Sequence, residues 1–146
     1  PHSFHYPPGS RRHLQRLCES FADLPKAVEF RGNDWQRDSV YRGLSEEKTA
    51  FVNVDEPRLP KLPAPTEVVS SELAYLRFHG RNAANWWKGD SVSRYDYLYG
   101  TDELSEWLPM IERMLAKARL LLVIFNNHSR GQAIQNARQL QGLLFG

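Results

Sequence analysis

Apolar residues recur along this chain at two spacings, which predict two kinds of element. Steps of three and four residues, typical of amphipathic helices, recur in the segments 10–24, 34–44, 102–118 and 133–144. Runs rich in Val, Leu, Ile, Phe and Tyr lie between them and predict strands at 27–31, 50–54, 73–80 and 120–127. Strands that alternate with helices indicate an α/β fold with a parallel sheet and right-handed crossovers.

Prolines and a serine refine the predicted boundaries. Ser10 is expected to cap the first helix, and Pro109 is expected to kink the third. Repeated prolines in the stretch DEPRLPKLPAPTE favour extended chain, so this stretch is expected to be a surface loop inside one domain. Residues 81–100, rich in Trp and Tyr, are expected to form an irregular loop. The continuous apolar run at 120–127 predicts a strand that is covered on both faces.

Three of the predicted strands alternate between polar and apolar residues, so each has a polar and an apolar face. The polar positions are Glu29 and Arg31, then Asn53 and Asp55, then Tyr75, Arg77 and His79. The apolar positions are Val28, Phe30, Val52, Val54, Leu76 and Phe78. In an open sheet with helices on both faces, a polar face would be costly. We therefore expect a closed barrel, with its apolar faces on outer helices and its polar faces turned inward.

Composition narrows the classes of function without selecting one. The 146 residues include 19 basic and 17 acidic side chains, a balance too even to indicate nucleic-acid binding from bulk charge. The longest apolar run is too short to span a membrane, so no membrane partner is expected, and no secretory signal is visible. Cys18 is the single cysteine and shares the apolar face of its helix. No internal disulfide is possible, and we expect a cytoplasmic protein.

Five stretches carry a resemblance to a known family, in the order AVEFR, VDEPR, LAYLRFHGRN, RYDYLYG and FNNHSRGQAIQNARQL. The chain resembles the YecE-like family, domain of unknown function 72, over nearly its whole length. The resemblance implies a TIM-type (β/α) barrel with parallel strands and outer helices. In the family, PHSFHY follows a strand near the middle of the domain. Residues 1–146 are therefore expected to be a single partial domain, the carboxyl-terminal half-barrel with the last four of eight strands, and the upstream half absent.

A half-barrel has a physical consequence that does not depend on its chemistry. Its first and last strands have unpaired edges, which favour pairing with another chain. Self-association is therefore expected. The family is itself uncharacterised, so the resemblance implies no reaction and no cofactor, and the question of whether the protein is an enzyme stays open.

The carboxyl ends of the strands, where parallel α/β folds place their chemistry, hold the candidates for catalysis. His79 and a carboxylate from Glu29 or Asp55 are expected to form a general base and its orienting partner. The alternative is a charge network that fills the barrel interior and catalyses no reaction.

A site for a small anionic or phosphorylated substrate is the first functional hypothesis. The segment NNHSRGQ lies between the last strand and the last helix, where TIM-type barrels often bind phosphate. The expected substrate-binding residues are Arg31, Arg77, Arg81, Asn82, Tyr97, Asn126, Asn127, Arg130 and Gly131. The alternative for the last segment is that Asn127 and Ser129 only cap the helix and that Arg130 is solvated.

A non-catalytic protein that binds nucleic acid or sugar is the hypothesis from a different class. In the loop at 81–100, Trp and Tyr rings alternate with Arg and Lys, a mixture that stacks bases or sugar rings. Alternatively the loop buries its own rings, which is our interpretation for Trp86. The histidines at 2, 5, 79 and 128 form no metal-ligand motif, so we assign no metal.

Overall fold

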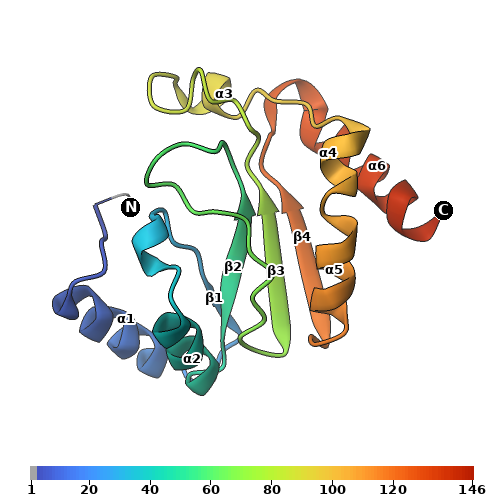
Figure 1. Ribbon diagram of the computed structural model, residues 1–146. Coiled ribbons are helices and arrows are strands. Elements are labelled where there is room, and N and C mark those ends of the chain that lie inside the picture. Colours follow the sequence, from blue (N-terminus) through green and yellow to red (C-terminus); the bar gives the residue numbers. More distant parts are fainter. Residues whose placement is uncertain (1–2) are drawn as a thin grey trace.

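The computed structural model describes residues 3–146, and its centre is one sheet of four parallel strands (Figure 1). His2 lies outside the described residues. The strands pair in chain order and are β1 (Lys26–Val28), β2 (Thr49–Asp55), β3 (Leu73–Phe78) and β4 (Leu120–Phe125). The predicted α/β fold with a parallel sheet is confirmed, although β1 ends three residues before Arg31.

Helices lie in two of the three connections between strands, and one further helix lies before β1 and one after β4. They are α1 (Pro8–Ser20), α2 (Asp38–Glu46), α3 (Ser91–Arg94), α4 (Thr101–Ser105), α5 (Leu108–Leu115) and α6 (Gln132–Phe145), with the short 3-10 turns η1 (Asn33–Trp35) and η2 (Ser129–Gly131). None of the helices in residues 3–146 combines the length and the apolar character needed to cross a lipid bilayer.

Prolines set two helix boundaries differently from the prediction. The first helix begins at Pro8, so the prediction of Ser10 as its cap is wrong. Pro109 lies in the first turn of α5, where a missing N–H costs no hydrogen bond. The expected kinked helix is therefore two shorter helices, α4 and α5.

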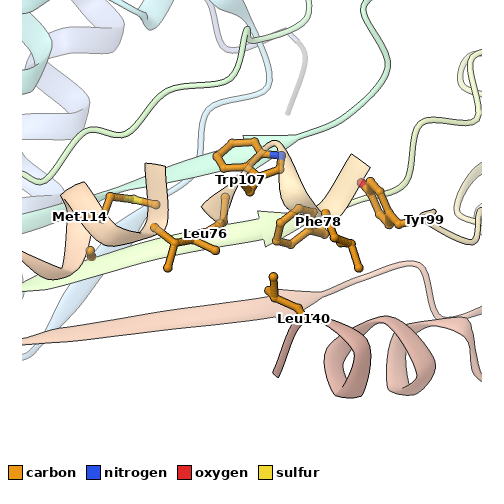
Figure 2. Close-up of a cluster of buried hydrophobic side chains, with 9 residues drawn as sticks. Leu76, Phe78, Tyr99, Trp107, Met114 and Leu140 are labelled. Carbon is orange, nitrogen blue, oxygen red and sulfur yellow. The ribbon is translucent and has the colours of Figure 1, made fainter. Parts of the chain in front are cut away.

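One face of the sheet, the covered face, carries both hydrophobic clusters. Its strand residues are Phe51, Asn53, Asp55, Leu76 and Phe78, which the strand register places on the same side. The first cluster packs Leu76 and Phe78 against Trp107, Met114 and Leu140 of the α4–α6 region (Figure 2). The second packs Phe51 and Phe30 against Trp35 and the residues of α1 and α2, and it includes Cys18, as predicted.

We call the opposite face of the sheet the open face. The residues that β2 and β4 place on it differ from the prediction. The register pairs Val52 with Tyr75 and Val54 with Arg77, so the valines of β2 belong to the open face. The expectation that Asn53 and Asp55 share a face with Arg77 is therefore wrong. In β4, Leu120, Leu122 and Ile124 are 54%, 36% and 40% exposed on the open face. The expectation that this strand is covered on both faces is also wrong.

The segment 56–72 crosses the covered face of β2 without forming a helix (Figure 1). The buried side chain of Asn53 anchors it, because its amide donates to Val68 O at 2.9 Å and its oxygen accepts from Val68 N at 2.8 Å. Ser70 adds a second anchor, since its hydroxyl accepts from Phe51 N at 2.8 Å. A polar side chain is therefore tolerated at Asn53 on the covered face, because it hydrogen-bonds the backbone of segment 56–72. The prolines of that segment lack N–H donors and cannot form a continuous set of strand hydrogen bonds.

Candidate functional site

Polar side chains gather where the open face meets the carboxyl ends of the strands. We call this group the strand-end cluster, and its members are Glu29, Arg31, Glu56, Arg77, His79 and Asn126. They come from all four strands or the residues that directly follow them. The strands are parallel, so their carboxyl ends lie at the same edge of the sheet, near α3 and its loop (Figure 1).

Glu29 is the centre of this cluster. Its carboxylate lies 2.5 Å from Arg77 Nη1, 3.1 Å from Arg31 Nε and 3.2 Å from His79 Nε2. Burial by itself raises the pKa of Glu29, but the hydrogen bond of His79 and the charges of Arg31 and Arg77 outweigh it and lower the pKa to about 2. Glu29 is therefore ionised at neutral pH, and the predicted contact between Glu29 and His79 is present.

His79 is fully buried and is held from two sides. The Asn126 amide lies 3.2 Å from Nδ1 and donates to it, which leaves Nε2–H to donate to Glu29. Burial lowers the pKa of His79, against the opposing hydrogen bond and charge of Glu29. The imidazole is thus neutral at pH 7, in one tautomer fixed by neighbours on β1 and β4.

Glu56 is the member of the cluster that sequence reasoning did not select. It is 1% exposed, and its Oε1 atom has no hydrogen-bond partner. Burial raises the pKa of Glu56 to about 8, with Arg31 opposing the rise and the charges of Glu29 and Asp55 adding to it. The signal was present in the sequence, because Glu56 lies two residues after Val54 and shares its face once β2 is oriented correctly.

The strand-end cluster carries an excess of positive charge. Two guanidinium groups, Arg31 and Arg77, contact one ionised carboxylate, Glu29. His79 and Glu56 are neutral at pH 7 by the pKa shifts described above. Arg77 Nε is buried and has no hydrogen-bond partner in the described residues. The cluster can therefore accept an anion with an oxygen placed to receive that donor.

Asp55 belongs to a separate cluster behind the sheet, so its predicted role as a partner of His79 is not supported by its position. Its buried carboxylate accepts two hydrogen bonds from Arg81, at 2.9 and 2.7 Å, and one from Trp107 Nε1 at 2.7 Å. Tyr99 OH donates a further bond at 2.9 Å. Asp55 thus joins β2 to the α4 region, because these donors satisfy a carboxylate on the covered face.

Arg81 is a predicted anion ligand, but the structure places it in the cluster of Asp55. Besides Asp55, its guanidinium contacts Glu103 at 3.3 Å and Glu106 at 2.9 Å. The hydrogen bond to Asp55 is the main reason that the pKa of Arg81 is raised. Three carboxylates already surround this guanidinium, so an incoming anion would meet net negative charge.

Three other predicted ligands hold the loop in place. Asn82 donates to the carbonyls of Ser93 and Asp96 at 2.9 and 3.1 Å, and Asn127 donates to Tyr97 O at 2.8 Å. Tyr97 OH donates to Glu103 at 2.5 Å. Of the five loop aromatics, Trp86 and Tyr99 are buried and only Trp87 is exposed. Trp86 is packed as predicted.

The segment before α6 places Arg130 and Gly131 on the surface. Arg130 lies 3.5 Å from the carboxylate of Asp96, and Gln132 donates to the same carboxylate at 2.8 Å. The carboxylate of Asp96 therefore occupies the position beside Arg130 that the expected phosphate would need. Of the predicted anion ligands, the structure brings together Arg31, Arg77 and Asn126.

A large hollow on the described surface lies elsewhere. It measures about 1070 Å³ and surrounds the amino ends of the strands, between Lys26, Lys48, Leu73 and Arg119. Its charged side chains are on the surface, whereas the strand-end cluster holds buried ionisable groups. We therefore place the candidate site at the carboxyl ends of the strands and not in this hollow.

Comparison with known proteins gives a consistent result. Residues 1–145 match the family described as "Protein of unknown function DUF72". The curated UPF0759 protein YunF of Bacillus subtilis is 30% identical over 145 residues, which cover 88% of this chain and 50% of YunF.

Two solved structures have the same fold over this region. A DUF72 family protein of Thermotoga maritima matches with a TM-score of 0.95 and 36% identity, over 100% of this chain and 55% of that one. A DUF72 family protein of Enterococcus faecalis matches with a TM-score of 0.89 and 35% identity, over 99% of this chain and 56% of that one. The chain spans about half the length of the relatives that it matches.

Proposed function

For this chain, which belongs to the DUF72 family, we propose a role as half of a TIM-type barrel whose strand-end cluster binds a small anionic, phosphorylated substrate. The barrel is supported by four parallel strands in chain order and, within residues 3–146, by hydrophobic clusters that pack helices against one face of the sheet. Relatives about twice as long supply the length for eight strands. The open face would then line the barrel interior.

One observation carries the choice of substrate class. Two partly buried guanidinium groups, Arg31 and Arg77, both contact the carboxylate of Glu29. The remaining positive charge lies partly buried, where water screens it weakly. Arginine is suited to phosphate because its planar fork donates two parallel hydrogen bonds. A phosphate oxygen that meets Arg77 Nε would also satisfy its unpartnered N–H.

Catalysis by the complete protein would use His79 as a general base. Glu29 accepts a hydrogen bond from Nε2–H and so keeps the lone pair on Nδ1, where the Asn126 amide is the one hydrogen-bond partner within residues 3–146. A substrate hydroxyl that displaces this amide would meet a neutral base with a fixed orientation. This is the Glu29–His79 pair of the sequence prediction, without Asp55.

Isothermal titration calorimetry with inorganic phosphate tests the proposal. The purified protein is expected to bind phosphate, and Arg77→Ala is expected to weaken binding by at least tenfold because a guanidinium contact is lost. Arg113→Ala is the matched control, since its guanidinium pairs with Glu67 on the surface. Unfolding midpoints show whether each variant is folded, and Arg77→Lys serves as a second variant that keeps the charge.

Turnover separates an enzyme from a binding protein. The protein is incubated with a panel of phosphorylated sugars, nucleotides and alcohols, and products are followed by ³¹P NMR. His79→Gln is expected to abolish turnover while phosphate still binds. Phosphate binding that is equal in the protein, Arg77→Ala and Arg113→Ala would refute the proposed site.

A further inference from the structure

We propose that the carboxyl group of Glu56 is a hydrogen-bond donor of the strand-end cluster and donates to an oxygen of the bound anion, beside Arg31. This inference rests on the proposed function and names a residue that binds the same substrate. A hydrogen bond from Glu56 would make the site selective for ligands whose oxygen atoms accept hydrogen bonds from both a guanidinium and a carboxyl group.

The first support is the position of Glu56. Its side chain is 1% exposed, yet Oε1 has no partner in the described residues, which is uncommon for a buried polar atom. The backbone carbonyl of Glu56 accepts from Arg58 Nη1 at 3.3 Å, but the carboxyl group takes no part in that bond. A buried acceptor without a donor costs stability, so proteins retain such groups where a ligand satisfies them.

The second support is the set of charges around the carboxyl group. Arg31 and Glu29, which follow β1, act on it with opposite signs, and so do Asp55 and Arg58 on its own segment. On the β3 side, Arg77 and His79 are turned toward Glu29, at 2.5 and 3.2 Å. These charges largely cancel at Glu56, so burial dominates and raises its pKa to about 8. A neutral carboxyl group donates a hydrogen bond to an anion, whereas an ionised one would repel it.

The affinity for an anion must then fall as pH rises, although Arg31 and Arg77 stay charged. Sulfate is the suitable probe, because it does not titrate near neutral pH, whereas phosphate does. If only the protonated form of Glu56 binds, a pKa of about 8 predicts affinity about tenfold weaker at pH ~9 than at pH ~6.5. His79 does not explain this change, because its pKa is lowered below the ordinary value, so its charged form is already the minor one at pH ~6.5.

The experiment compares sulfate binding by calorimetry at the two pH values in the protein, Glu56→Gln and Glu67→Gln. Glutamine keeps an N–H donor at every pH, so Glu56→Gln is expected to bind sulfate equally well at both. Glu67→Gln, which changes a carboxylate paired with Arg113 on the surface, is expected to keep the tenfold change. Circular dichroism confirms that both variants are folded.

A direct titration gives a second readout. In protein labelled with ¹³C at the glutamate carboxyl, the resonance missing from Glu56→Gln is expected to titrate near pH ~8. A resonance that titrates at the ordinary value of a glutamate would overturn the proposal. Sulfate affinity that depends on Arg77 but not on pH would also overturn it and leave the proposed function standing. Sulfate that does not bind at any pH would refute both.

Discussion

Arg81 forms a bidentate pair with the carboxylate of Asp55, with Nε 2.9 Å from Oδ1 and Nη2 2.7 Å from Oδ2. Asp55 is fully buried, and the indole of Trp107 donates to it as well. The pair ties the end of β2 to the chain after β3 and to α4. Its function is thus to hold the sheet and the helices together at the edge that carries the strand-end cluster.

Replacing Asp55 tests this structural role. Asp55→Asn is expected to lower the free energy of unfolding by about 3 kcal/mol, because it leaves the partly buried Arg81 without its main counter-charge. Urea unfolding measures the change. Glu72→Gln is the control, since both members of its pair with Arg119 are exposed, and it is expected to change stability by less than about 0.5 kcal/mol. Equal effects of the two variants would contradict the assignment.

Gly80 is a second structural position that a single change tests. Its φ of +90° is rarely adopted by other residues, and a Cβ there would lie 2.8 Å from Tyr97 Cβ. Gly80→Ala is therefore expected to cost about 2 kcal/mol or more, seen as a lower Tm. Gly142→Ala in α6 meets no atom within 4 Å and is expected to raise Tm instead. A neutral Gly80→Ala would show that the turn is more adaptable than its geometry indicates.

Glu56 predicts a dependence of stability on pH even without a ligand. Its pKa is raised from 4.5 to about 8, so between these values the unfolded chain has lost a proton that the folded chain keeps. Stability from this group is therefore full below pH 4.5 and decreases as pH rises through 8, by about 1.4 kcal/mol per pH unit within the window.

Comparison of the protein with Glu56→Gln isolates this contribution from those of other groups. The unfolding free energy of Glu56→Gln is expected to depend less on pH than that of the unaltered protein. The difference between the two therefore shifts in favour of the variant between pH ~5 and pH ~8. Chemical denaturation at four pH values within the window measures the difference. A constant difference at all four would mean that Glu56 is ionised in the folded protein.

The open face predicts self-association through a second copy of the chain. Leu120, Leu122 and Ile124 are exposed there, and within residues 3–146 the outer edges of β1 and β4 pair with no strand. Light scattering after size exclusion is expected to give about twice the 16.9 kDa of one chain. Leu122→Lys should restore the single-chain mass, whereas Leu115→Lys, at a leucine that is also exposed but lies on α5, should not. A single-chain mass for the unaltered protein at high concentration would refute the prediction.

The sequence predicted the strand-end cluster best where polar residues interrupt an apolar strand. At the end of β3, Arg77 and His79 alternate with Leu76 and Phe78, so only one orientation buries the apolar pair, and the contacts with Glu29 followed from it. In β2 the pattern VNVDE gives the same kind of preference, for placing Val52 and Val54 against the helices, and the structure shows the opposite orientation. Local alternation alone therefore did not orient this strand correctly.

The orientation of β2 is decided by partners far away in the sequence. Asn53 bonds Thr66 and Val68, and Asp55 bonds Arg81 and Trp107. These donors satisfy the buried polar side chains of Asn53 and Asp55 on the covered face. The alternation of residues within β2 carries no information about such distant partners. Because β2 is turned this way, the chain contributes Glu56 rather than Asp55 to the strand-end cluster.

The helix-free connection between β2 and β3 has a consequence for folding. Residues 56–72, all of them described, form no helix that would shorten the chain before the two strands meet. The entropy of closing this loop must therefore be lost when the strands pair, with little local structure to offset it. Its prolines reduce the freedom that the unfolded segment has to lose. The same residues that prevent a helix thus lower the entropic barrier to joining the two halves of the sheet.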